Sequence, residues 1–223
     1  MKTIVIIHNL NSRGKNINED YVRELLNKKG MKFHYFQTKQ ISDVDEIIKK
    51  YNNPSEFQYC SIGGDGSLNA LVNSLMKNNI TMPEVSCLPG GSGSDFIRTF
   101  ALPQNIEQAV EHLNYDNFYE VDVGLIKNKT DARYFINVLN IGFLASTVEV
   151  SEKFPNLFRA FRYPLSFWIK IITARAKEMT ISNDKFEFKG MAFNICVCNA
   201  QYFGGGWNIC LLYTSDAADE SRG

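Results

Sequence analysis

The stretch that decides the fold is Ser61-Ile62-Gly63-Gly64-Asp65-Gly66-Ser67-Leu68-Asn69. It follows an apolar and aromatic segment, residues 57–60, that is typical of the end of a strand. It leads into apolar residues that are spaced as on one face of a helix. Glycines let the backbone approach a ligand closely, and the N–H groups of a helix's first turn point toward an anion. A strand, a Gly-rich turn and a helix in this order therefore predict a phosphate site in a nucleotide-binding protein.

Two polar side chains within this turn have different expected roles. The pattern offers no structural role for Asp65, which predicts contact with a metal ion, a ribose hydroxyl or a transferred proton. Ser67 is expected to be the N-cap of the following helix, because a serine oxygen can accept a hydrogen bond from a first-turn N–H. Asp65 is therefore the candidate catalytic residue.

The chain up to residue 120 alternates strand-like and helix-like segments. The expected strands are 3–7, 32–36, 58–62 and 85–88, and the expected helices are 18–29, 43–51, 68–77 and 105–113. Continuous apolar strands that alternate with amphipathic helices predict an α/β domain, with a parallel sheet covered on both faces. Ligands of such sheets bind beyond the carboxyl ends of the strands. Three polar or Gly-rich loops lie at such ends, at 8–15, 63–67 and 89–95.

The pattern changes at about residue 121 and becomes rich in strands. Strands are expected at 121–126, 134–141, 185–188 and 191–198, with helices at about 144–153 and 164–179. Residues 211–223 are small and acidic without periodicity, and we expect them to be a non-native tail on a chain cut within a domain. The predicted organisation is an α/β domain at 1–120, a partial β-rich domain at 121–210 and this tail.

The composition excludes some classes of protein. Its 24 basic and 24 acidic residues cancel, which argues against a bulk nucleic-acid binder. The five cysteines are odd in number and lie mostly in apolar runs, which favours reduced thiols and a cytoplasmic location. Residues 154–179 combine aromatic and basic side chains, which indicates either a peripheral contact at the inner membrane face or a core helix with a solvated basic face.

Taken together, the three loops in this order and spacing resemble the diacylglycerol-kinase-type lipid kinases, which include sphingosine kinases and bacterial lipid kinases. The resemblance continues through Thr38 and the runs 121–124, 134–137 with 142–143, and 199–206, and it covers residue 2 to about 209. It implies an N-terminal nucleotide domain of NAD kinase-like fold and a C-terminal β-sandwich. It also implies that Mg²⁺ and ATP serve to phosphorylate a lipid hydroxyl in the cleft between the domains.

Matching position by position, the resemblance implies a set of ATP-binding residues. They are Asn9, Asn11, Ser12, Arg13, Thr38, Gly63, Gly64, Asp65, Gly66, Ser67, Asn69, Gly91 and Ser92. This chain departs from the family's usual residues at Leu10, Ala70 and Ser94, where proline, glutamate and asparagine are common. In bacterial members the acidic Mg²⁺ ligands and the general base lie beyond the region that matches. We therefore expect this 223-residue chain to bind nucleotide weakly and to transfer little phosphate.

Two other interpretations stay open at this point. An NAD kinase shares the Gly-Gly-Asp-Gly turn, and its soluble acceptor does not need an aromatic and basic helix. A non-catalytic protein that binds a nucleotide or a lipid is favoured if the shortened C-terminus is genuine. For a lipid kinase the acceptor could be a sphingoid base, diacylglycerol, phosphatidylglycerol or a glycolipid precursor, because acyl pockets are built from generic apolar residues.

Overall fold

The computed structural model describes residues 2–12, 17–91, 94–113, 118–143, 146, 162–183 and 185–208. The chain forms two compact units. The first contains the described residues up to Asn137 together with those from Asn199 onward, and the second is Val138–Cys198. The expected domain boundary after residue 120 stays a prediction.

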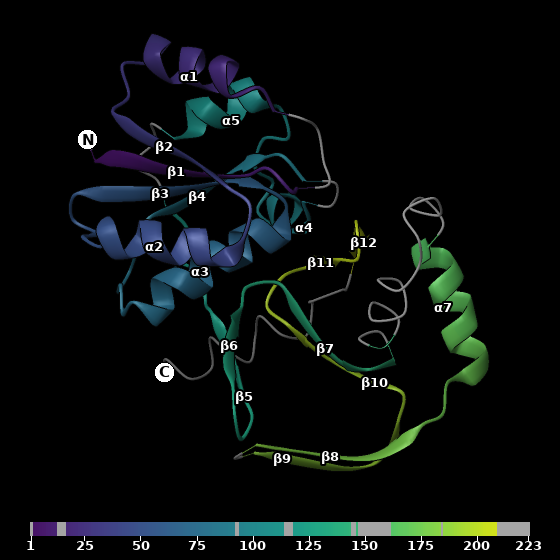
Figure 1. Cartoon of the computed structure of the whole chain (residues 1–223). Coiled ribbons are helices and arrows are strands. Elements are labelled where there is room, and N and C mark those ends of the chain that lie inside the picture. The colour runs from purple at the N-terminus through teal and green to yellow at the C-terminus, as the bar shows by residue number, and fades with distance from the viewer. Residues whose placement is uncertain are drawn as a thin grey trace. The chain divides into compact units, whose positions relative to one another are not determined.

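A parallel sheet of four strands organises the first unit (Figure 1). Its strands are β1 (Thr3–Asn9), β2 (Phe33–Thr38), β3 (Phe57–Gly63) and β4 (Val85–Pro89), in the order β2-β1-β3-β4. From β1 the chain moves outward to β2, and from β3 it moves outward in the opposite direction to β4. The carboxyl ends of β1 and β3 therefore flank the topological switch point, where sheets of this kind bind their ligands.

Helices cover both faces of this sheet (Figure 1). One face carries α1 (Glu19–Lys28) and α5 (Ile106–His112), and the other carries α2 (Ile41–Lys50) and α3 (Asp65–Lys77). Along β1, Ile4 and Ile6 pack with α1 and α5, whereas Val5 and Ile7 pack with α2 and α3. Successive strand residues point to opposite faces, so a strand covered twice must be apolar throughout. The expected α/β fold is confirmed.

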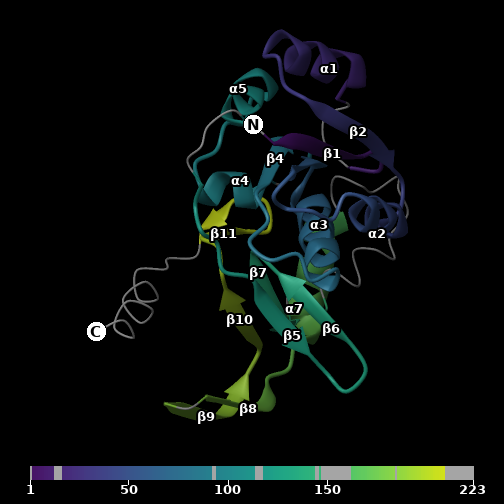
Figure 2. The ribbon, with the colours of Figure 1, turned by 90° about the vertical axis from the view of Figure 1, so that its left-hand side faces the viewer.

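Two small antiparallel pairs complete the described part of the first unit. The strands β5 (Gly124–Lys127) and β6 (Ala132–Phe135) form a hairpin, and β11 (Tyr202–Phe203) pairs with β12 (Trp207–Asn208). Figure 2 shows β11 beside α4 (Asp95–Thr99), the short helix that follows β4. Just after β6, Ile136 is buried against Leu68 and Val72 of α3.

The second unit is rich in strands, as expected. The strand β7 (Val138–Gly142) pairs with β10 (Asn194–Cys198), and β8 (Lys177–Asn183) pairs with β9 (Phe186–Ala192). It also contains the helix α7 (Arg162–Thr173). Among the described residues, no helix is both long and apolar enough to cross a lipid bilayer.

Two expected elements of the second half are wrong. The helix expected at 164–179 ends at Thr173, because residues from Lys177 onward pair with β9 as a strand. The strand expected at 134–141 is divided into β6 and β7, because Ile136 turns into the core and Asn137 toward Asp65. The helix expected at about 144–153 falls largely, and the tail at 211–223 wholly, outside the described residues.

Candidate active site

The loop after β1 is bound to the start of α3. The Asn9 Nδ2 donates a hydrogen bond to Ser67 Oγ at 2.9 Å, and the Asn9 Oδ1 accepts one from the Asn11 N–H at 2.9 Å. Helix α3 begins at Asp65 with Gly64 as its N-cap, so the prediction that Ser67 is the N-cap is wrong. The Ser67 hydroxyl instead joins the first loop to the second.

The same first loop also contacts the loop after β4. The Ser12 Oγ donates to the Gly90 carbonyl at 3.0 Å, and the Gly90 N–H donates to the Gly63 carbonyl at 3.0 Å. A Cβ placed on Gly91 would lie 2.2 Å from the Cα of Gly64, so these two loops touch backbone to backbone. All three loops therefore converge at the carboxyl ends of β1, β3 and β4. The predicted residues Arg13 and Ser92 lie outside the described residues.

A pocket of ≈ 220 Å³ opens beside this junction, at the carboxyl ends of β1 and β2 and the start of α3. It is lined by Asn9, Asn11, Thr38, Gly66 and Ser67 of the predicted nucleotide residues, and also by Ile7, Lys39, Gln40, Ile41, Val44, Ala70 and Arg133. The structure thus gathers side chains from three separate segments of the predicted set around one space.

Thr38 and His8 are buried near the carboxyl ends of β2 and β1, next to the first loop. Thr38 is buried, and its Oγ1 donates to the His8 carbonyl at 3.3 Å, while its own carbonyl accepts the Leu10 N–H at 3.0 Å. The His8 Nδ1 lies 2.8 Å from the hydroxyl of Tyr35. Burial lowers the pKa of His8, and the nearby charge of Glu19 opposes that shift. The neutral ring is therefore the form that the fold favours.

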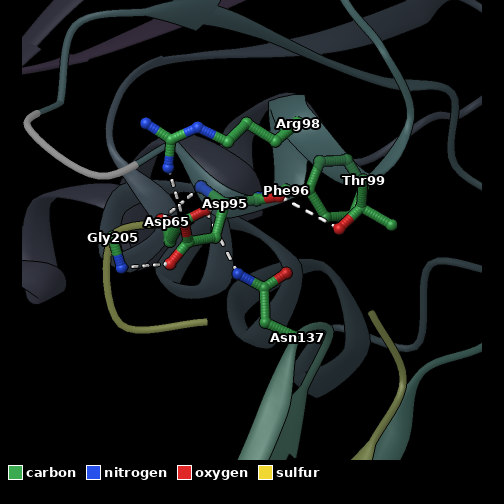
Figure 3. Close-up of polar contacts among 7 residues, drawn as sticks. All are labelled: Asp65, Asp95, Phe96, Arg98, Thr99, Asn137 and Gly205. Carbon is green, nitrogen blue, oxygen red and sulfur yellow. Dashed lines mark hydrogen bonds and ion pairs between the residues drawn. The ribbon is translucent and has the colours of Figure 1, made fainter. Parts of the chain in front are cut away.

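Asp65 has a structural role that the sequence pattern did not reveal (Figure 3). Its Oδ2 accepts the Asp95 N–H at 2.9 Å, and its Oδ1 accepts the Phe96 N–H at 2.9 Å. These are first-turn donors of α4, which lack partners within their own helix. The Asp65 carboxylate thus caps α4 from the first residue of α3, and the expectation that it has no structural role is wrong.

Asp95 extends this network to the Gly-rich turn between β11 and β12 (Figure 3). Its carboxylate is buried, accepts the Gly205 N–H at 2.9 Å and pairs with Arg98 at 2.9 Å. Gly204, Gly205 and Gly206 have φ values of 62°, 90° and 113°, which side-chain-bearing residues rarely adopt. The signal in the sequence that points to this residue is its place directly after a Gly-rich loop.

The polar atoms around Asp65 fit a hard cation. A carboxylate has about four lone-pair sites, and Asp95, Phe96 and Asn137 (Nδ2 to Oδ1, 3.1 Å) occupy three of those on Asp65. The Oδ1 atom of Asn137 is buried without a hydrogen-bond partner, and amide and carboxylate oxygens are what Mg²⁺ prefers. Within the described ranges, no group of three or more His, Cys, Asp or Glu residues could hold a metal ion. These residues could thus supply a few oxygens to Mg²⁺ or its water.

Asn137 was not among the predicted site residues, although it belongs to a run that carried the resemblance. Its backbone carbonyl accepts the Asn199 N–H at 2.9 Å. The Asn199 Nδ2 also donates to the carbonyls of Ile136 at 3.1 Å and Asp122 at 2.6 Å. Asn199 therefore fixes the point at which the chain turns between β6 and β7, and with it the position of the Asn137 amide.

Comparisons with known proteins identify the family of this chain. Residues 3–126 match the model of the diacylglycerol kinase catalytic domain. The chain is 25% identical to a Streptococcus pneumoniae protein named "Putative lipid kinase", over 91% of this chain and 68% of that protein. It is also 25% identical to "Probable lipid kinase YegS" of Escherichia fergusonii, over 88% of this chain and 67% of that protein.

The fold is also found among solved structures. A structure described as "a putative diacylglycerol kinase from Bacillus anthracis" matches with a TM-score of 0.69 at 23% identity, over 92% of this chain and 68% of that one. A second Bacillus anthracis structure, described as one of the diacylglycerol kinases, matches with a TM-score of 0.66 at 22% identity. At this level of identity the likeness shows the fold. The chain spans about two thirds of the length of these relatives.

Proposed function

Since the chain belongs to the diacylglycerol kinase catalytic domain family, we propose that it is a lipid kinase that transfers the γ-phosphate of ATP to a lipid hydroxyl. The observation that carries this proposal is the junction of three loops at the carboxyl ends of the strands, with a pocket beside it that the first loop and the start of α3 line. Hydrogen bonds join Asn9 to Ser67 and Ser12 to Gly90, and Gly64 touches Gly91. Phosphoryl transfer depends chiefly on positioning and on stabilisation of charge, and such a junction of backbone turns supplies both.

The nucleotide is held by residues of the first unit. Asn9, Asn11, Thr38, Gly66 and Ser67 line the pocket at the start of α3, where first-turn N–H groups and the helix dipole favour an anion. Asp65, the first residue of α3, is hydrogen-bonded to Asn137, and oxygens of these two residues would hold Mg²⁺ or its water. When bound, Mg²⁺ neutralises the negative charge of the phosphates.

Incubation of the protein from the full reading frame with γ-labelled ATP and separate acceptors tests this function. The acceptors are diacylglycerol, a sphingoid base, phosphatidylglycerol and NAD. We expect label in a lipid product and none in NAD. Label in NAD alone would establish the rival NAD kinase, and ATP binding without any labelled product would leave a non-catalytic nucleotide-binding protein.

We also propose that residues 154–179 contact a membrane surface, which brings the enzyme to its acceptor. Residues 154–161 lie outside those described, and α7 begins the described part of this segment. On α7, Trp168 is 63% exposed and Ile172 is 82% exposed. Exposed apolar side chains on a helix with basic residues nearby suit the headgroup boundary of anionic lipid.

Sedimentation with vesicles tests this contact. Binding to phosphatidylglycerol vesicles should weaken as salt rises and should be reduced about threefold or more by Ile172→Ser, because buried apolar area and charge both contribute. The matched control is Met82→Ser, which removes another exposed apolar side chain, 78% exposed, from the first unit. Equal sedimentation of both variants and the parent protein would show that α7 does not enter the lipid.

A further inference from the structure

A positively charged side chain, that of Arg133, lies at the nucleotide pocket. Neither the sequence pattern nor the resemblance identified it. Arg133 of β6 lines the same space as Asn9, Asn11 and Ser67. It comes from a segment far from the three loops in the sequence. Its side chain is exposed rather than packed into the core, so it is available to a ligand.

The structure holds this part of β6 in a defined place. On α3, the Asn73 Nδ2 donates to the Tyr134 carbonyl at 2.9 Å, and the Asn73 Oδ1 accepts the Tyr134 N–H at 3.0 Å. The amide of Asn73 thus pairs with the backbone of the residue next to Arg133, much as a neighbouring strand would. Since α3 also provides Gly66 and Ser67 to the pocket, the position of Arg133 is tied to the element that holds the expected phosphate contacts.

The charges around the pocket favour an anionic ligand. Among the described residues that line it, Lys39 and Arg133 carry positive charge and none is acidic. A carboxylate does lie close to Lys39, because the Asp43 Oδ2 accepts the N–H groups of Lys39 at 2.8 Å and Gln40 at 3.1 Å. These hydrogen bonds lower the pKa of Asp43, which keeps its charge beside Lys39. No ion pair within the described part of the chain involves Arg133.

We propose that Arg133 binds phosphate oxygens of the nucleotide and so sets the preference of this pocket for a polyphosphate. This rests on the proposed function, since it takes the pocket to be the nucleotide site. A guanidinium presents a planar fork of donors that matches two phosphate oxygens, and its charge persists at every pH at which the protein is folded. An arginine without a carboxylate partner keeps that capacity for the ligand.

Calorimetric binding of ATP, ADP, AMP and inorganic triphosphate to the 223-residue chain tests this inference. The parent chain should bind ATP more tightly than AMP. Arg133→Gln should weaken the binding of ATP about tenfold and that of AMP less than twofold, so most of the preference for ATP over AMP is lost. Arg133→Lys should have an intermediate effect.

The matched control is Lys127→Gln, which removes an equal charge from the same hairpin at a residue that does not line the pocket. If Lys127→Gln and Arg133→Gln weaken ATP equally, the effect is general electrostatics and the inference is wrong. If ATP binds and Arg133→Gln changes nothing, the inference alone fails. If the chain binds triphosphate through Arg133 without any gain from adenosine, the phosphate subsite stands and the proposed nucleotide donor falls.

Discussion

The Asp65 Oδ1 accepts the N–H of Phe96 at 2.9 Å, so that the first residue of α3 caps the next helix, α4. Two elements that meet at the candidate site are thereby fixed to each other through one carboxylate. A change at Asp65 consequently alters both the local fold and any ligand contact. Activity alone does not separate the two.

The stability of an Asp65→Asn variant separates them. The amide keeps the size but loses the charge and one acceptor oxygen, so a first-turn N–H of α4 is left unpaired. We expect a loss of about 1–2 kcal/mol in the free energy of unfolding, measured by urea denaturation. The matched control is Asp20→Asn, an exposed first-turn aspartate of α1, which should change stability by less than about 0.5 kcal/mol. Equal stability of Asp65→Asn and the parent would show that the cap contributes little.

The contact between Gly64 and Gly91 predicts a steric effect. Gly91→Ala places a Cβ 2.2 Å from the Cα of Gly64, so the second and third loops must separate. We expect a destabilisation of about 1–3 kcal/mol, measured by thermal and urea unfolding. Gly66→Ala is the steric control for unfolding, because its Cβ would meet nothing within 4 Å. An unchanged midpoint for Gly91→Ala would contradict the close approach of the two loops.

The buried ring of His8 predicts a dependence of stability on pH. Its pKa in the folded protein lies below the usual 6.5, so between the two values the unfolded chain binds more protons than the folded one. The contribution of His8 to the free energy of unfolding is therefore complete above pH 6.5, and it decreases as the pH falls below that value. Urea unfolding of the parent chain and of His8→Gln between pH 7.5 and about 5.5 checks this. The free energy of unfolding should change less with pH in His8→Gln than in the parent chain. An equal change in both would exclude His8 as the source of the pH dependence.

The thiols should differ strongly in reactivity. Burial raises the pKa of both Cys60 and Cys87 to about 12, and the thiolate is the reactive form. Cys196 is exposed on β10. Treatment of the native chain with iodoacetamide at about pH 8, followed by peptide mass spectrometry, should modify Cys196 well before Cys60 and Cys87. All should react in urea, and early labelling of Cys60 would indicate that the sheet opens locally.

Much of the first unit could be predicted from the sequence because its signals are local. The apolar run at residues 3–7 and the helical spacing after Gly66 each report burial on a face of their own segment. The ends of several helices and strands could not be predicted from the sequence, since they depend on partners elsewhere in the chain. Residues 177–179 look like a continuation of a helix, and only their pairing with residues 190–192 makes them a strand.

The candidate site divides in the same way. The Gly-rich turns and the order of the loops are written in the sequence, because glycine at these positions reflects the local backbone. The pairing of Asn73 with Tyr134, the capping of α4 by Asp65 and the place of Arg133 beside Asn9 join residues that are 30 or more positions apart. No local pattern encodes such contacts. The sequence by itself determined that a phosphate-binding α/β fold forms, whereas only tertiary packing decided which side chains surround the pocket and which are held by the structure.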